Sequence, residues 1–259
     1  GGPVGDRAAA LRPRPSAVLT LRPPGSALAS SEGVLFFDPL FLLFLVPGVL
    51  LSLWASFRVR SSFSKYGDVP SARGLTGAQV AETLLRSRGA RGVRIEATRG
   101  QLTDHYDPRH QILRLSRSVY GSSSLAAVGV AAHEAGHALQ HADGYAPLKF
   151  RSAIVGPASL GSNLGFFLAI IGLVFNAAQL VWLGGALFGV FVLFTLATLP
   201  VEFDASRRAI AALKAQNILG PKELEGASSV LRAAGMTYLA SAATAVLQLA
   251  YFAFAASEE

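Results

Sequence analysis

Cysteine does not occur in this chain of 259 residues, and methionine occurs only once. Without cysteine the chain can form no disulfide bond, no thiolate zinc site and no cysteine nucleophile. The absence also argues against a small extracellular domain held together by disulfide bonds. Any protein ligands of a metal ion must therefore be histidine, aspartate or glutamate side chains.

Charge is the second property that the sequence has little of. Charged residues make up 15% of the chain, whereas a soluble domain usually carries about 25%. The deficit is concentrated in three charge-free runs, at residues 39–57, 152–201 and 233–257. About 20 apolar residues cross a bilayer as a helix, so the outer runs predict one transmembrane helix each. The middle run predicts two, with a turn at residues 176–179. Buried core helices of a soluble protein are an alternative that the length of these runs disfavours.

The basic residues are distributed as in a membrane protein. Fourteen Lys and Arg lie within residues 58–151 and five within residues 207–232, whereas residues 176–179 and 256–259 have none. The positive-inside rule then predicts that 58–151 and 202–232 lie in the cytoplasm and that both termini lie outside. The four arginines of residues 1–33 run against this placement of the N-terminus. Despite a net charge of +7, no nucleic-acid partner is predicted, because no aromatic-basic nucleic-acid motif is present.

Residues 1–33 are rich in Gly, Pro, Ala and Arg and show no periodic apolar pattern. Their apolar stretch at residues 17–21 is too short for the core of a signal peptide. We therefore predict that this segment is disordered, or that it is a spurious extension upstream of the working protein.

A short amphipathic helix is predicted after the first apolar run. Thr76 and Gln79 match a capping box, and Val80, Leu84 and Leu85 fall on one face of the helix that it would start. This pattern is typical of a helix that packs on a soluble core.

Two segments, 93–97 and 111–116, alternate between apolar and polar residues and predict strands, with a polar turn at 100–108 between them. Together they indicate a small sheet or hairpin in front of a helix at residues 125–141. The serines at 122–124 supply the N-cap of this helix.

Prolines divide the second half of the chain. Leu199-Pro200 predicts the start of a cytoplasmic helix that ends near Gln216. Gly220-Pro221 predicts a break and then a further helix that runs toward the last apolar run. The chain is therefore predicted to be mainly α-helical with a small β-sheet.

Residues 133–137 have the sequence HEAGH and lie on the predicted helix 125–141. Because residues i and i+4 share one helix face, the imidazoles of His133 and His137 can bind one zinc ion. Glu134 is close enough to take a proton from a water molecule that the metal acidifies. By average residue usage, roughly one chain in a hundred of this length would contain HExxH by chance, so its place on a predicted helix favours a metal site. Gly136 predicts that a strand or the substrate approaches this helix closely.

The third ligand has three candidates. His141 lies two turns beyond His133 and is too far along a helix to share its ion. Asp143 stands where a longer HExxHxxGxxH/D motif places a ligand, but Gln140 replaces the Gly that this motif needs. Glu202 lies in the first turn of the predicted cytoplasmic helix, where a carboxylate also interacts with the helix dipole. Spacing alone leaves the choice open.

Several stretches carry a resemblance to a known family. They are LFFDP at residues 35–39, RGLTG at 73–77, GQLTDHYDP at 100–108, AAHEAGHALQ at 131–140, YAPL at 145–148 and TLPVEFDASRRA at 198–209. In this order, over about 220 residues, the chain resembles the YugP-type neutral zinc metallopeptidases, a family of bacterial membrane proteases. Residues 1–33 lie outside the resemblance.

The family is similar in plan to the HtpX-like and CAAX-prenyl endopeptidases, in which a Glu on a helix after the membrane hairpin is the third ligand. The resemblance therefore implies Zn²⁺ as cofactor, Glu202 as third ligand and a zincin-like metallopeptidase domain integrated with about four transmembrane helices. Those relatives carry an acidic residue four places after the ligand. This chain has Ser206 there, and Asp204 becomes the candidate outer partner of the site.

The predicted function is that of a zinc-dependent endopeptidase in the bacterial cytoplasmic membrane, which cuts membrane or membrane-associated proteins at the cytoplasmic face. Glu134 is the predicted general base. His105, Tyr106 and Arg207 are candidates for stabilising the oxyanion.

Two alternatives remain. An intramembrane metalloprotease would place HExxH inside a span, but the 15 residues between Ser124 and Gln140 are few for one. A catalytically silent zinc-binding scaffold or adaptor would have no use for Glu134, because a structural zinc site needs no base.

The predicted organisation has five parts after residue 33. These are a first transmembrane helix (34–57), a cytoplasmic metallopeptidase region (58–151), a transmembrane hairpin (152–200), cytoplasmic helices with the third ligand (201–235) and a last transmembrane helix (236–257).

Overall fold

The structure is a computed structural model, and it describes residues 39–90 and 92–257. The predictions made for residues 1–33, and the start of the predicted first transmembrane helix at 34–38, lie outside the described residues.

The described chain is mainly helical. Its helices are α1 (Pro39–Gly67), α2 (Gly77–Ser87), α3 (Arg117–Tyr120), α4 (Leu125–Ala142), α5 (Ala146–Leu160), α6 (Phe166–Val174), α7 (Ala178–Ala215) and α8 (Pro221–Ser257). A π-helical segment, η2 (Gly161–Gly165), joins α5 to α6, and the strands are β1 (Arg94–Thr98), β2 (His105–Asp107) and β3 (Ile112–Ser116).

Four helical segments within the described residues are long and apolar enough to cross a membrane, by length and composition. They are Pro39–Gly67, Ala146–Val174, Ala178–Ala215 and Pro221–Ser257. The prediction of four such helices is therefore confirmed. Asn176 lies between the second and third segments with a φ of 49°, in the left-handed conformation of a tight turn, close to the predicted hairpin tip.

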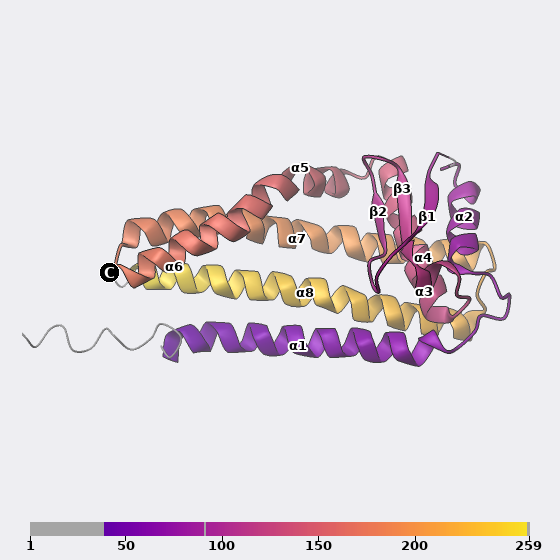
Figure 1. Ribbon diagram of the computed structural model, residues 1–259, viewed down its shortest axis with the longest axis horizontal. Helices are drawn as coiled ribbons and strands as arrows, with labels where there is room; N and C mark the ends of the chain where they lie inside the picture. The colour runs from indigo at the N-terminus through magenta and orange to yellow at the C-terminus, as the bar shows by residue number, and fades with distance from the viewer. Residues whose placement is uncertain (1–38, 91, 258–259) are drawn as a thin grey trace, which may run out of the picture. The chain divides into compact units, whose positions relative to one another are not determined.

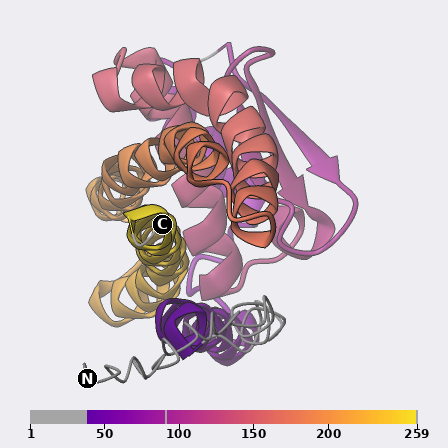
Figure 2. The same ribbon diagram turned by 90° about the vertical axis from the view of Figure 1, so that its left-hand side faces the viewer.

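The long helices lie side by side, with α8 between α1 and α7 (Figures 1 and 2). Helices α5 and α6 pack on α7. An aromatic cluster of Phe41, Phe188, Tyr251 and Phe252 is buried among α1, α7 and α8. Helices α2, α3 and α4 and the strands gather around one end of α7 and α8 (Figure 1).

The predicted helix start at Pro200 is wrong, because α7 runs without interruption through this residue. The predicted break before Pro221 is confirmed, since α7 ends at Ala215 and α8 begins at Pro221 and continues to Ser257 as one helix. A proline inside a helix costs about 3 kcal/mol, but in long membrane helices neighbouring elements compensate for it. Here α4, α5, α6 and α8 all pack on α7. One helix thus reaches from the apolar bundle into the polar end of the molecule.

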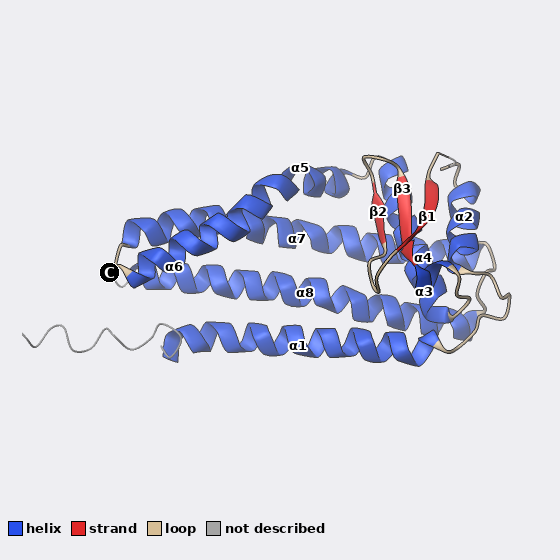
Figure 3. Ribbon diagram, viewed as in Figure 1, coloured by secondary structure: helices blue, strands red, loops and turns tan. Residues whose placement is uncertain are grey.

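The sheet has three strands in the order β1-β3-β2 (Figure 3). The two predicted strands pair in parallel, with Ile95 opposite Leu113, so they form a sheet and not a hairpin. The third strand, β2, lies inside the segment predicted as a polar turn and pairs antiparallel with β3. Its three residues, His105, Tyr106 and Asp107, are too few and too polar to show an alternating pattern.

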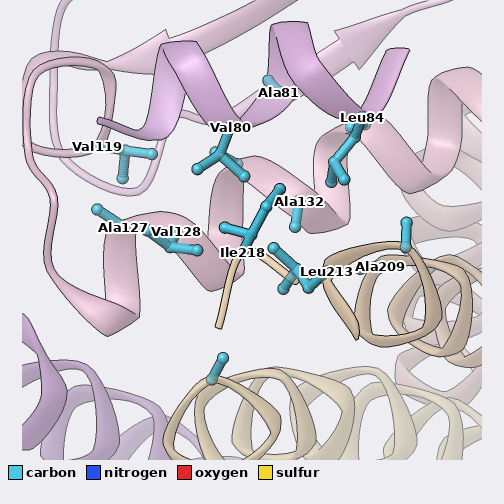
Figure 4. Close-up of a cluster of buried hydrophobic side chains, with 14 of the residues drawn as sticks. Val80, Ala81, Leu84, Val119, Ala127, Val128, Ala132, Ala209, Leu213 and Ile218 are labelled. Carbon is cyan, nitrogen blue, oxygen red and sulfur yellow. The ribbon is translucent and has the colours of Figure 1, made fainter. Parts of the chain in front are cut away.

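The core at this end is packed around α4 (Figure 4). The predicted apolar face of α2 is buried there, since Val80 and Leu84 have no exposed surface. The predicted caps are also present. Thr76 and Gln79 form the capping box of α2, and Ser124 accepts a hydrogen bond from the Ala127 amide at the start of α4. These caps and contacts fix where α4 begins and which face it turns toward α7.

Candidate metal centre

Helices α4 and α7 pack against each other and bring together three side chains that can bind a metal ion. The Nε2 atoms of His133 and His137 lie 3.2 Å and 3.4 Å from the same carboxylate oxygen, Oε2 of Glu202. The ligand atoms of the three residues all lie within 4.8 Å of one another. His133 and Glu202 are 69 positions apart in the sequence, so only the packing of α4 against α7 brings them together.

The geometry of the group fits zinc. A tetrahedral zinc ion with bonds of about 2.0–2.1 Å keeps its ligand atoms about 3.3–3.4 Å apart. The two nitrogen-to-oxygen distances of 3.2 and 3.4 Å agree with this spacing. Two histidines and one carboxylate are also the ligand set of many catalytic zinc sites, in which a fourth position stays open.

Gly136 allows α7 to come this close to α4. A Cβ atom at position 136 would lie 2.5 Å from the carbonyl oxygen of Ala205, a distance that real Cβ atoms essentially never show. The sequence indicated that a strand or the substrate would approach this glycine, but the approaching segment is the backbone of α7. Glu202 lies one turn before Ala205 on that helix, so Gly136 sets the separation between the histidines and Glu202.

Each histidine of the group has an outer partner at its Nδ1 atom. Nδ1 of His133 lies 3.0 Å from the hydroxyl of Ser206, and Nδ1 of His137 lies 3.1 Å from Oε1 of Gln140. A proton on Nδ1 leaves the lone pair of Nε2 free for a metal. Ser206, which the sequence places four residues after Glu202, therefore contacts His133 directly.

Gln140 connects His137 to α7. It is fully buried, and its Nε2 donates hydrogen bonds to the Val201 carbonyl at 2.8 Å and to Oδ2 of Asp204 at 2.9 Å. Arg208 donates to the same carboxylate. Gln140 therefore links Asp204 to His137 through hydrogen bonds. From the sequence, Gln140 was noted only because it replaces the glycine of the longer motif.

Glu134 lies on α4 between the two histidines and is 8% exposed. Burial by itself would lower the pKa of His137, but the hydrogen bond to Glu202 and the negative charges of Glu134 and Glu202 outweigh it, so the pKa of His137 is raised. The centre therefore favours positive charge at the position where the ligand atoms meet, as a cation site should.

Two further residues reach the centre from other helices. Arg151 of α5 places Nη2 3.9 Å from Oε1 of Glu202, and its buried Nε has no hydrogen-bond partner among the described residues. Tyr238 of α8 lies close enough to Glu202 and Glu134 to feel the charges of both carboxylates. The sequence analysis missed both. Arg151 is the last charge before the apolar run 152–201, and Tyr238 lies within the run 233–257, where an aromatic residue is common at a membrane interface.

The remaining candidates lie elsewhere. The hydroxyl of Tyr106 is 2.8 Å from Nδ1 of His141, and Nδ1 of His105 lies 2.8 Å from the Thr103 carbonyl. Burial, and then the charge of Asp107, raise the pKa of Tyr106, so its phenol stays protonated. Within the described part of the chain, neither His105 nor Tyr106 forms a hydrogen bond with His133, His137 or Glu202.

Two charged candidates form ion pairs of their own. Asp143, considered as a third ligand, pairs with Arg208. Arg207, considered for the oxyanion, pairs with Asp204 and is largely exposed. Of the three ligand candidates that spacing left open, the structure brings Glu202 to the histidine pair.

The fold and the site define a protein with four membrane-length helices and a buried group of two histidines and a glutamate. The chain matches the family described as "Putative neutral zinc metallopeptidase" over residues 41–257. It is 40% identical over 213 residues to "Putative membrane protease YugP" of Bacillus subtilis (strain 168), an alignment that covers 82% of this chain and 95% of that protein. No solved structure matches the chain. The chain belongs to this neutral zinc metallopeptidase family, and membership implies Zn²⁺ as its cofactor.

Proposed function

We propose that this protein is a membrane-anchored, zinc-dependent endopeptidase of the zincin type. The observation that carries the proposal is the convergence of His133, His137 and Glu202 on one point, with Glu134 beside them and family membership in support. Its substrates are peptide bonds of membrane or membrane-associated proteins, because the helices that carry Glu202 and Tyr238 are themselves long and apolar enough to span a bilayer.

Zinc bound by the three ligands would supply a Lewis acid that polarises the scissile carbonyl and acidifies a water molecule. Glu134 accepts a proton from the attacking water at its carboxylate and later passes it to the leaving amine. Its burial suits this role, because a carboxylate with little competing solvent holds the proton close to the reacting atoms. The base is carried by the same helix turn as the ligand histidines.

Arg151 and Tyr238 donate hydrogen bonds to the carbonyl oxygen as negative charge develops on it. Arg151 lies near Oε1 of Glu202, whereas the histidines lie near Oε2, and Tyr238 lies close to the same carboxylate group. A buried guanidinium nitrogen without a partner is an available donor. This pair replaces His105, Tyr106 and Arg207 as our proposal for oxyanion stabilisation.

The domain boundaries and the orientation are part of the proposal. The metallopeptidase region comprises residues 58–151 together with the polar ends of α7 and α8, and it lies at the cytoplasmic face of the bacterial membrane. The supporting feature is the basic excess of residues 58–151 and 202–232. Helix α4 is not among the four membrane-length segments, which disfavours the intramembrane alternative, and Glu134 disfavours a silent scaffold.

Metal removal tests the proposed function. The full-length protein in detergent micelles should cleave fluorescein-labelled casein, and 1,10-phenanthroline should stop the cleavage. Stoichiometric zinc added after removal of the chelator should restore it. Cleavage that persists after the metal content has fallen to zero would show that the activity does not need zinc.

Substitution Tyr238→Phe should lower kcat without changing zinc affinity. Removing one donor to a developing oxyanion costs about 10²–10³-fold in kcat, and the phenyl ring keeps the packing of α8. The measurements are kcat and KM on a quenched fluorescent peptide, together with zinc affinity by chelator competition. Tyr120→Phe, a partly exposed tyrosine on α3, is the matched control. If Tyr238→Phe instead weakens zinc and leaves kcat of the zinc-loaded enzyme intact, Tyr238 only orients Glu202.

A further inference from the structure

A cavity of about 470 Å³ lies between α7 and α8. Its apolar lining includes Phe203 and Ile210 from α7 and Leu231 and Met236 from α8. Cavities that bind small molecules usually measure about 300–1,000 Å³, so this one is large enough to hold part of a ligand. The proposed reaction does not use it.

Three basic side chains also line the cavity: Arg207, Lys214 and Arg232. Arg207 pairs with Asp204. Lys214 and Arg232 have neither an ion pair nor a side-chain hydrogen bond to any residue that the structure describes. No acidic residue is among the described residues that line the cavity. Its charge therefore suits an anion, and two of its cations are available for one.

The cavity lies where the apolar helices become polar. Helix α7 has no charged residue from 178 to 201, and α8 has none from 233 to 257. From Phe203 to Lys214 the cavity follows α7 for about 16 Å at 1.5 Å per residue. The headgroup layer on each side of a bilayer is about 5–8 Å thick. The end with Phe203 and Met236 therefore adjoins the hydrocarbon region, and the basic residues reach through the headgroup layer.

We propose that this cavity binds an anionic phospholipid. The acyl chains would lie against Phe203 and Met236, and the phosphate would lie beside Arg232, one helix turn from Met236. The Lys214 side chain would reach from the far end of the cavity toward the polar part of the headgroup. Basic pockets between membrane helices recognise anionic headgroups in this way. An acidic peptide would satisfy the cations but leave the apolar end unfilled, so the combination of chemistries favours the lipid.

The lipid would also touch the surroundings of the metal centre. Ser206 lines the cavity, and its hydroxyl lies 3.0 Å from Nδ1 of His133. The bilayer could therefore influence the orientation of one ligand histidine through this serine. The binding inference itself does not depend on the proposed peptidase activity.

Lipid retention by the purified full-length protein tests the inference. Native mass spectrometry in non-ionic detergent would count phosphatidylglycerol and phosphatidylcholine molecules bound by the wild type and by Lys214→Gln/Arg232→Gln. Each cation near an anionic surface contributes about fivefold in affinity, so the double variant should bind phosphatidylglycerol about 30-fold more weakly. Arg88→Gln/Lys222→Gln removes two exposed charges outside the cavity and should bind it as the wild type does.

A second variant keeps the charges and fills the space. Ala211→Phe, at a lining position, should also reduce phosphatidylglycerol binding, and free glycerophosphoglycerol or inorganic phosphate should not displace the lipid. Equal phosphatidylglycerol binding by wild type and Lys214→Gln/Arg232→Gln would overturn the inference. So would displacement by the free headgroup, or by an acidic peptide at the same concentration.

Discussion

Replacing Glu134 with glutamine is expected to abolish peptide cleavage while zinc stays bound. Glutamine has nearly the same shape as glutamate, so the buried position next to His133 and His137 can accept it without repacking α4. It cannot take up the proton of the attacking water. Loss of a general base costs about 10²–10⁴-fold in rate, and the neighbouring carboxylate, Glu202, cannot replace it if that residue binds the metal as we propose.

The measurement is casein cleavage by Glu134→Gln together with its zinc content by plasma emission spectroscopy. Glu82→Gln on α2 serves as the control, since this exposed glutamate forms an ion pair with Arg86 on the same helix. A variant that holds one zinc ion per chain and still cleaves at the wild-type rate would remove Glu134 from the mechanism. Loss of zinc as well as activity would show that Glu134 helps to hold the metal.

Replacing Glu202 with alanine is expected to release zinc. The residue is one of the three proposed protein ligands, and its Oε2 lies within 3.4 Å of both histidine nitrogens. Removing only an outer partner of a metal ligand costs about 10–100-fold in metal affinity, so removing a ligand itself should cost more than about 100-fold. Without Glu202, Arg151 also loses the carboxylate that it faces and adds repulsion toward a bound cation.

Glu202→Gln and Glu225→Gln complete this experiment. The first keeps the volume of the side chain but removes the negative charge, so zinc affinity should fall in the same direction as in Glu202→Ala. The second removes one exposed charge from α8 and should leave affinity unchanged. Zinc affinity would be measured by competition with a chromogenic chelator. Wild-type affinity in Glu202→Ala would assign the third ligand to another residue.

The two predictions separate binding from turnover. Glu134→Gln should retain the metal and lose the reaction, whereas Glu202→Ala should lose the metal and therefore the reaction. If both variants behave alike, Glu134 on α4 and Glu202 on α7 do not have the separate roles of base and ligand.

Local patterns in the sequence determined the elements of this protein. Charge-free runs predicted four membrane-length helices because the thickness of the bilayer sets how long an apolar helix must be to span it. The spacing of His133 and His137 predicted a shared helix face, and the serines before Leu125 predicted where that helix starts. Each of these inferences involves residues that are neighbours along the chain.

The sequence was less informative where an element depends on its neighbours in space. Pro200 has the pattern of a helix start, yet α7 continues through it because packing on four other helices offsets the lost backbone bond. Strand β2 is stabilised by pairing with β3, and its own three residues carry no strand pattern.

The candidate site shows the same division. The sequence by itself predicted two ligand histidines and a base, and left three choices for the third ligand until a family resemblance favoured Glu202. Only the tertiary structure decided that the close approach of α7 to Gly136 places Glu202 against the histidines. It also brought Arg151 and Tyr238 to the same point. Such contacts join residues that are far apart in the chain. Helix periodicity specifies the face of its own helix on which a residue lies, but not which second helix packs against that face.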